Sequence, residues 1–268
     1  MRDFLNEIAE HANEALSDPD PVRRAQIQMK RPLPKRFYKE VSVGGDEASG
    51  YSVLLDGKTV KTPARKALAV PTKALAELIA AEWEAQVSEV DPARMPVTRL
   101  VNTALDAIAA DPLPVRDDIV RFCESDHLCY RADTPEALIE RQAKAWDPVI
   151  EWAASTLGAR FILVQGIMHQ TQPREAVAAF AKAVAKHENA IALASLHTVT
   201  TLTGSALLAI AFAQGHLDAD TAWHLSHVDE DWTTEHWGED AEATARRAAK
   251  TIELQAAAAV FRALAGAA

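Results

Sequence analysis

A long uncharged stretch, from Ala190 to Ala213, constrains the fold of this chain more than any other feature. It reads AIALASLHTVTTLTGSALLAIAFA and contains no Asp, Glu, Lys or Arg. A stretch of this length can cross a bilayer, but His197, Gly204 and a row of hydroxyl residues interrupt it, and no basic flank sets an orientation. We therefore predict one helix that is buried on all sides at the centre of a helical domain. A peripheral membrane scaffold is the alternative, and stable membrane insertion is not expected.

The segment from Arg36 to Val70 has the periodicity of β-strands instead. It contains four short runs bounded by glycine-rich turns or proline, namely RFYKEVSV, GYSVLL, KTVKT and KALAVP. Asp56-Gly57 joins the second run to the third, and this dipeptide favours a two-residue hairpin turn because glycine readily adopts a positive φ. The pattern predicts a small, mostly antiparallel β unit.

From Thr72 onward the spacing of apolar residues is helical. Thr72 is a candidate N-cap, and prolines open several of the helices that follow. Pro148 lies within one long helical pattern and predicts a kink there. The short apolar run RFILV, at residues 160–164, is either an extra strand or a packed loop.

These patterns predict an α+β fold in which a small antiparallel β-rich domain precedes a larger all-α helical domain. The expected boundaries are 36–71 for the β-rich domain and 72–268 for the helical domain. Residues 1–35 are expected to form an N-terminal helix, near 3–15, and a proline-punctuated linker arm.

Charge and cysteine content exclude several classes of function. The chain has 268 residues and a formal net charge of −10, so no nucleic-acid partner is expected, because a phosphate-backbone binder needs a basic face. Cys123 and Cys129 form neither a CxxC pair nor a disulfide framework, which favours a reducing compartment. The start MRDFLNEIAEHANEA carries acidic residues, unlike a secretory signal or a transit peptide.

Candidate functional residues gather in AWHLSHVDEDWTTEHWGEDAE, from Ala222 to Glu242, which holds three of the nine histidines and seven acidic residues. On a continuous helix, four of them would share one face: His224, His227, Asp231 and Glu235. Such a row could hold zinc or iron, so a metal-dependent helical enzyme is one hypothesis. However, HExxH and paired Glu-x-x-His motifs are absent. A solvated polar face and a partner-binding surface explain the same residues.

No phosphate-binding glycine loop and no serine nucleophile elbow occurs in the sequence. Catalytic, cofactor-binding and metal-binding residues are therefore not predicted outside the metal hypothesis. Cys123 is interpreted as a buried small apolar residue. Arg131 is interpreted as the partner of an interior carboxylate.

Several phrases, taken together, resemble one family, the assembly chaperones that escort the α subunit of the F1 sector of ATP synthase. These phrases occur in this order: RFYKEV, GYSVLLDGKTVKTPARKALAVP, AEWEAQ, DPARMPVTRLVNTALD, CYRA, WDPVIEW and HWG with acidic residues before it. The likeness runs from about Arg36 to about Arg247. A match of order and spacing across many blocks is far more specific than any single motif.

The resemblance implies a chaperone without ATPase activity and without a cofactor. Such a protein binds an unassembled F1 α subunit until a β subunit replaces it, and a monomer is the simplest expectation. The implied fold agrees with the one predicted from periodicity. The family is known from mitochondria and α-proteobacteria, so we expect the bacterial cytoplasm here and the mitochondrial matrix for eukaryotic relatives.

In the family pattern an acidic pair lies shortly before Trp-Gly, which matches Asp229 and Glu230 ahead of Trp237-Gly238. The residues Trp232, Thr233 and Thr234 between them differ from those of many relatives. Starting from these positions, we predict a partner-binding surface made of six residues: Asp229, Glu230, Trp232, Glu235, Trp237 and Glu239. In this hypothesis Asp229, Glu230 and Glu235 meet basic groups of the α subunit, and Trp237 is an apolar anchor.

A structural interpretation competes with this one. In it, Glu230 caps a helix or pairs within the chain, for example with Arg246 or Arg247, and Trp237 packs between helices. The sequence leaves both interpretations open.

Overall fold

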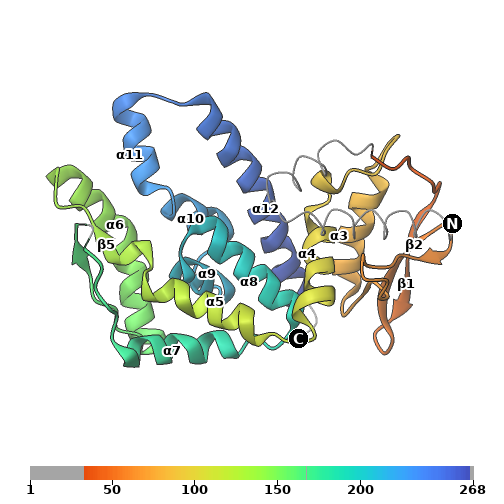
Figure 1. Ribbon diagram of the computed structural model, residues 1–268, viewed down its shortest axis with the longest axis horizontal. Coiled ribbons are helices and arrows are strands. Elements are labelled where there is room, and N and C mark those ends of the chain that lie inside the picture. The colour runs from red at the N-terminus through yellow and green to blue at the C-terminus, as the bar shows by residue number, and fades with distance from the viewer. Residues whose placement is uncertain (1–32, 167, 266–268) are drawn as a thin grey trace, which may run out of the picture.

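The computed structural model describes residues 33–166 and 168–265. A small antiparallel sheet lies at one end and helices form the rest of the described chain (Figure 1). The predicted α+β fold class is thus confirmed. The expected helix at 3–15 and nearly all of the 1–35 arm lie outside the described residues, and the boundaries 36–71 and 72–268 stay predictions.

The sheet is built around β2, which pairs antiparallel with three other strands. The four strands are β1 (Val41–Asp46), β2 (Gly50–Leu55), β3 (Lys58–Thr59) and β4 (Ala69–Val70). Asp56 and Gly57 both have positive φ, 49° and 75°, as the expected hairpin turn requires. The first strand begins later than RFYKEVSV suggested, because Tyr38 turns toward the next helix and donates a hydrogen bond to Trp83 O (2.6 Å).

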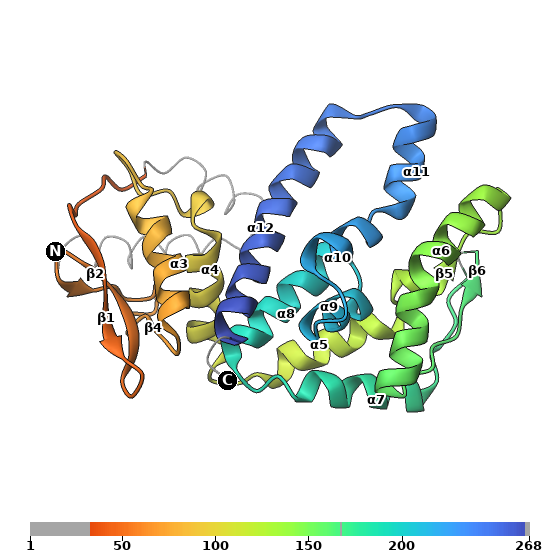
Figure 2. The same ribbon diagram turned by 180° about the vertical axis from the view of Figure 1, so that it is seen from behind.

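Helix α3 (Lys73–Glu84) begins at the predicted N-cap and lies next to the sheet (Figure 2). Thr72 Oγ1 accepts a hydrogen bond from Leu75 N (3.1 Å). Helix α4 (Pro96–Thr103) follows, and the carboxylate of Glu82 accepts hydrogen bonds from Val97 N and Thr98 N, both at 2.7 Å. An acid on α3 therefore satisfies free N–H groups at the start of α4, which fixes the two helices relative to each other.

Among the described residues, eight more α-helices follow: α5 (Leu113–Glu124), α6 (Glu136–Trp152), α7 (Arg174–Ala185), α8 (Ala190–Thr203), α9 (Ala206–Ala213), α10 (Ala219–Leu225), α11 (Val228–Trp237) and α12 (Ala241–Ala265). Short helical turns occur at η1 (Pro92–Arg94), η2 (Ala104–Ile108), η3 (His127–Cys129) and η4 (Ala153–Leu157). Pro148 lies inside α6. The run RFILV supplies the start of a short strand, since β6 (Val164–Gln165) pairs in parallel with β5 (Tyr130–Arg131).

The last helix, α12, packs against both the helices beside the sheet and the helices of the larger part. Helix α12 contacts α3 and α4 beside the sheet and also α8 and α10 in the helical part (Figure 2). Near its end, Ala263 O accepts a hydrogen bond from Thr72 Oγ1 (2.9 Å), and further up Glu253 pairs with Arg99. Ser195 of α8 donates to Ala257 O (2.6 Å).

The uncharged stretch forms two helices rather than one, and it is mostly but not wholly buried, since Thr201 and Gly204 are exposed. Helix α8 ends at Gly204, whose φ of 68° stops the helix. Ser205 then caps α9, in which every residue from Ala206 to Phe212 is buried. The prediction of a single helix was therefore wrong. Among the described residues, no helix is both long enough and apolar enough to cross a bilayer.

A buried carboxylate holds the junction between α8 and α9. The Oδ2 atom of Asp126, which is fully buried, accepts hydrogen bonds from Ser205 Oγ and Leu207 N, both at 2.9 Å. Its Oδ1 atom accepts one from Leu128 N (3.1 Å). Asp126 thus replaces the water that the first N–H groups of α9 would otherwise need.

The interpretation of Cys123 as a buried residue is confirmed, and that of Arg131 holds in part. Cys123 and Cys129 are free thiols with no exposed surface, and burial raises the pKa of each thiol. Arg131 pairs with the carboxylate of Asp147 (2.8 Å), although Asp147 is half-exposed rather than interior. The guanidinium of Arg131 also lies over the ring of Trp146, at 5.4 Å from its centroid.

Replacing Asp126 with alanine should destabilise the fold strongly. The change leaves Ser205 Oγ, Leu207 N and Leu128 N without acceptors in a dry interior, so we expect the free energy of unfolding to fall by about 2–4 kcal/mol. Urea unfolding followed by circular dichroism measures this as a lower midpoint. Asp117→Ala, at an exposed position of α5, is the control, and equal midpoints for the two variants would contradict the proposed role of Asp126.

Candidate partner-binding surface

The histidine-rich stretch is divided between two helices. Helix α10 ends at Leu225 and α11 begins at Val228, so a bend lies between the candidate ligands. His227 sits at this bend, only 6% exposed, with its ring 4.0 Å from that of Trp223 and its Nδ1 2.8 Å from Trp223 O. The continuous helical face expected for the metal hypothesis is therefore wrong.

The two carboxylates among the candidate metal ligands pair with arginines of other helices. Asp231 of α11 pairs with Arg247 of α12, and both carboxylate oxygens of Glu235 accept hydrogen bonds from Arg141 of α6, at 2.5 and 2.8 Å. Among the four candidate ligands, Asp231 Oδ2 lies 3.8 Å from His224 Nδ1. Across residues 33–166 and 168–265, no group of three or more His, Cys, Asp or Glu side chains could hold a metal ion.

Helix α11 and the first half of α12 form a projecting hairpin, which we call the α11–α12 hairpin (residues 228–250). It stands away from the rest of the helical part, and residues 238–240 connect its two arms (Figures 1 and 2). From residue 229 to residue 250 no side chain is buried, and most are exposed. Gly238 adopts a φ of 91° where α11 ends, and Asp240 Oδ1 accepts from Ala243 N (2.8 Å) at the start of α12.

An aromatic row lies along α11 toward the tip of this hairpin. The rings of Trp232 and His236 stack with centroids 4.1 Å apart, and the ring of Trp237 follows at 5.9 Å from His236. Trp237 is 76% exposed, so the expectation that it packs between helices is wrong. Tryptophan side chains are mostly buried in folded proteins, so this degree of exposure is unusual, and it offers a large apolar contact area to a partner.

The acidic residues of the predicted surface divide into two groups. Asp229 accepts a hydrogen bond from Gln142 Nε2 (2.8 Å) and Glu235 pairs with Arg141, so both hold α11 against α6. The Arg141 guanidinium lowers the pKa of the Glu235 carboxyl below its usual range. In contrast, the side chain of Glu230 is 70% exposed and Glu239 is exposed.

Glu230 does not make the internal pairs considered for it. Arg246 pairs with Glu242 on its own helix (2.5 Å), and Arg247 pairs with Asp231. The Glu230 carboxylate instead lies beside His227, with Oε2 3.7 Å from Nε2. The expected pairing was wrong by one residue, because the helical phase turns Asp231 rather than Glu230 toward α12.

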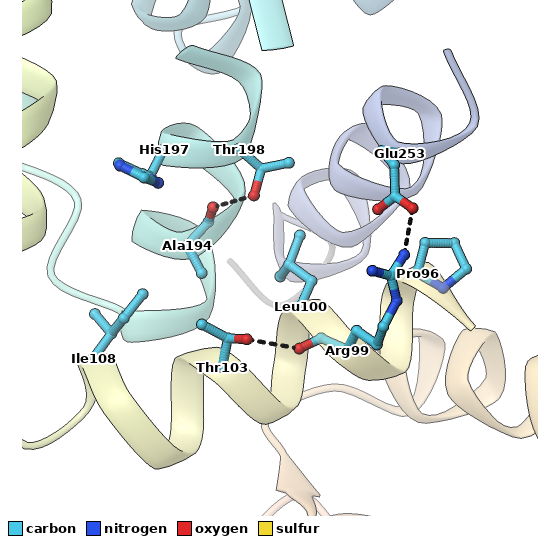
Figure 3. A pocket seen from close by; sticks show the side chains of 9 residues that line it. All are labelled: Pro96, Arg99, Leu100, Thr103, Ile108, Ala194, His197, Thr198 and Glu253. Carbon is cyan, nitrogen blue, oxygen red and sulfur yellow. Dashed lines mark hydrogen bonds and ion pairs between the residues drawn. The ribbon is translucent and has the colours of Figure 1, made fainter. Parts of the chain in front are cut away.

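Figure 3 shows a pocket of about 200 Å³ between α4, α8 and α12. Arg99 and Glu253 pair across two of these helices, and two threonines of the lining donate to carbonyls of their own helices. His197 contacts Asp118 of α5 (2.9 Å). The polar groups that line this pocket are thus used in contacts within and between helices.

A second pocket, of about 260 Å³, lies at the foot of the α11–α12 hairpin. Helices α6, α10 and α11 contribute its lining: Arg141, Lys144, Ala145, His224, Leu225 and Val228. Sequence reasoning missed Arg141 and Lys144, since they lie about 90 positions before the hairpin and only the fold brings them together.

Comparison with known proteins identifies the family. A family model described as ATP12 chaperone protein matches residues 35–154. The crystal structure of Atp12 from Paracoccus denitrificans is 36% identical and aligns with a TM-score of 0.80 over 86% of this chain and 98% of that one. This chain belongs to the ATP12 chaperone family. The predicted resemblance is confirmed at this level.

Two further relatives of this ATP12-family chain are similar over most of its length. The Atu1473 protein of Agrobacterium tumefaciens is 57% identical, with a TM-score of 0.85 over 98% of this chain and 97% of that one. Protein atp12, mitochondrial, of Schizosaccharomyces pombe is 26% identical over 230 residues, which cover 80% of this chain and 77% of that protein. The matched region of the ATP12 family model, 35–154, ends before the α11–α12 hairpin begins.

The stability of this ATP12-family chain should fall on mild acidification. Burial lowers the pKa values of His187 and His227, whereas unfolded histidine titrates near about 6.5. The unfolded state therefore binds protons at a higher pH than the folded state. The stabilisation is complete above about pH 6.5 and is lost as the pH falls toward the folded-state pKa values.

Urea midpoints at about pH 7.5 and about pH 5.5 test this, because histidine titrates between these values. His227→Gln should show a smaller loss on acidification than the parent chain. His224→Gln is the matched control, since the His224 side chain is 69% exposed. If both variants lose as much as the parent chain, His227 does not contribute to the pH dependence.

Proposed function

We propose that this ATP12-family chain is an assembly chaperone that binds the unassembled F1 α subunit of ATP synthase. In this role it binds the surface of the α subunit that later contacts a β subunit, and it dissociates when the β subunit binds. A free subunit exposes apolar surface at its unfilled interface, and such surface promotes aggregation. The role requires binding and release but no chemical step.

The observation that carries the proposal is the exposed aromatic and acidic surface of the α11–α12 hairpin. Trp237 is 76% exposed, and Glu230 and Glu239 lie exposed on the same hairpin. Aromatic residues surrounded by polar groups are typical of binding hot spots. We propose that Trp237 inserts into an apolar depression of the client and that the two acids meet basic groups beside it.

The other three members of the predicted surface divide between binding and support. Trp232 extends the aromatic row, while Asp229 and Glu235 hold α11 on α6. We propose that Asp229 and Glu235 act by positioning the hairpin rather than by contacting the client. Trp232 is half-buried, so its contribution to the client contact is smaller than that of Trp237.

We also propose that the chain acts as a monomer in the compartment where F1 is assembled, which in a bacterium is the cytoplasm. A one-to-one complex suits a hairpin that presents a single aromatic tip. The polar rim keeps the contact exchangeable, because exposed charge pairs add specificity and association rate more than affinity.

Trp237→Ala should weaken binding to the F1 α subunit most. Loss of an aromatic hot spot costs about 2 kcal/mol, or roughly thirtyfold in Kd, and the fold should be unaffected because Trp237 is exposed. Glu230→Lys should weaken binding by about tenfold. Binding of the purified full chain to the purified α subunit, measured by biolayer interferometry, gives both values.

Two control variants accompany these changes. Val87→Ala removes another exposed apolar side chain, 82% exposed, and Glu47→Lys makes the same charge change in the turn between β1 and β2. Both controls should bind like the parent chain. Failure of the parent chain to bind the α subunit would contradict the proposed function, and equal binding by parent, Trp237→Ala and Glu230→Lys would contradict the proposed surface.

A further inference from the structure

The pocket at the foot of the α11–α12 hairpin, called the foot pocket below, has an apolar floor. Ala145 of α6, Leu225 of α10 and Val228 of α11 form this floor. Its volume is about 260 Å³, and a cavity of about 150 Å³ already holds a benzene molecule. The foot pocket can therefore accept one aliphatic or aromatic side chain together with some adjoining backbone.

The rim of the foot pocket is cationic on a protein of net charge −10. Its charged members are Arg141, which pairs with Glu235, and Lys144, and His224 completes the rim. Lys144 is exposed and makes no ion pair with any part of the chain that the structure describes. Because an unpaired lysine beside an apolar floor attracts carboxylates, the rim favours an acidic neighbour for whatever side chain enters.

The geometry of Arg141 reinforces this preference. Glu235 holds its guanidinium through two parallel hydrogen bonds, and the ring of Trp232 lies 6.0 Å from its central carbon. Asp231, the other acid nearby, is paired with Arg247. The acids on α11 that face this side are therefore already bound to arginines, while the Lys144 ammonium remains available to a ligand.

We propose that the foot pocket binds an apolar side chain of the client polypeptide that has an Asp or Glu carboxylate next to it. The apolar side chain packs on Leu225 and Val228, and the carboxylate pairs with Lys144. This inference rests on the proposed function, because it assigns a second contact to the same client. The tip of the hairpin then selects basic groups and its foot selects an acidic one.

Two charge preferences at opposite ends of one helix define an orientation. A client segment docked along α11 places basic groups near Glu239, just beyond the end of α11, and its acidic-apolar pair near Lys144. The reverse orientation brings like charges together at both ends, which costs binding energy. The foot pocket thus sets the direction in which the client lies on the hairpin.

Site-specific photo-crosslinking with the purified full chain and the purified F1 α subunit tests the proposal. A benzophenone amino acid replaces Lys144 in one variant, Trp237 in a second and Lys182 in a third. Lys182 is an exposed lysine on α7 and is the matched control. We expect crosslinks from positions 144 and 237 but none from position 182, and mass spectrometry identifies the crosslinked peptides.

The peptide reached from position 144 should contain an apolar residue within two positions of an Asp or Glu. A crosslink from position 237 without one from 144 overturns the foot-pocket proposal and leaves the proposed function standing. A crosslink from 144 to a basic segment, or to a second copy of this chain, also overturns it. If the parent chain does not bind the α subunit at all, the proposed function itself fails.

Affinity measurements provide an independent readout. Lys144→Glu should raise the Kd for the α subunit by about tenfold at low salt, while Lys144→Arg and Lys182→Glu should bind like the parent chain. The difference between Lys144→Glu and the parent should shrink as salt is added, because screening weakens exposed charge pairs. Equal affinities for Lys144→Glu and Lys182→Glu would overturn the proposal.

Discussion

The helical part of this molecule depends on one buried carboxylate. Asp126 accepts hydrogen bonds from Ser205 Oγ and Leu207 N, and so fixes the point at which an uncharged stretch divides into α8 and α9. Helix α9 is buried from Ala206 to Phe212 and contacts α5, α6, α8 and α10. Since α10 leads directly into α11, the position of the projecting hairpin follows from this junction.

Local chemistry made much of the fold predictable. Asp56-Gly57 specified its turn because few dipeptides accept two consecutive positive φ angles, and Thr72 specified the start of α3 by its side-chain oxygen. The division at Gly204-Ser205 was harder to foresee. Glycine and serine also occur within helices, and the group that stabilises the break, Asp126, lies about 80 positions away in the sequence.

The candidate surface was predictable in outline but not in its internal pairing. The composition of Val228–Trp237 indicated acids and aromatics, yet it did not show which acids face the protein. That depends on the bend at His227, which resets the helical phase, and on Arg141 and Gln142 from α6. A single continuous helix would have aligned His224 with Glu235; the bend instead turns Glu235 to Arg141 and leaves Trp237 exposed.

The hairpin is held firmly at its foot and progressively less toward its tip. At the foot, Val228 is buried and Trp146 Nε1 donates to Leu225 O (2.8 Å). Above it, Asp229, Asp231 and Glu235 each contact α6 or α12.

Beyond Glu235, the described contacts of His236 and Trp237 are confined to α11 itself. A binding residue carried on a supported helix loses less conformational entropy on association than one carried on a loop. The contacts of α11 with α6 and α12 therefore hold the exposed Trp237 in position before a partner binds. Because Trp237 itself contacts only α11 among the described residues, its release from a partner disrupts no contact with another helix.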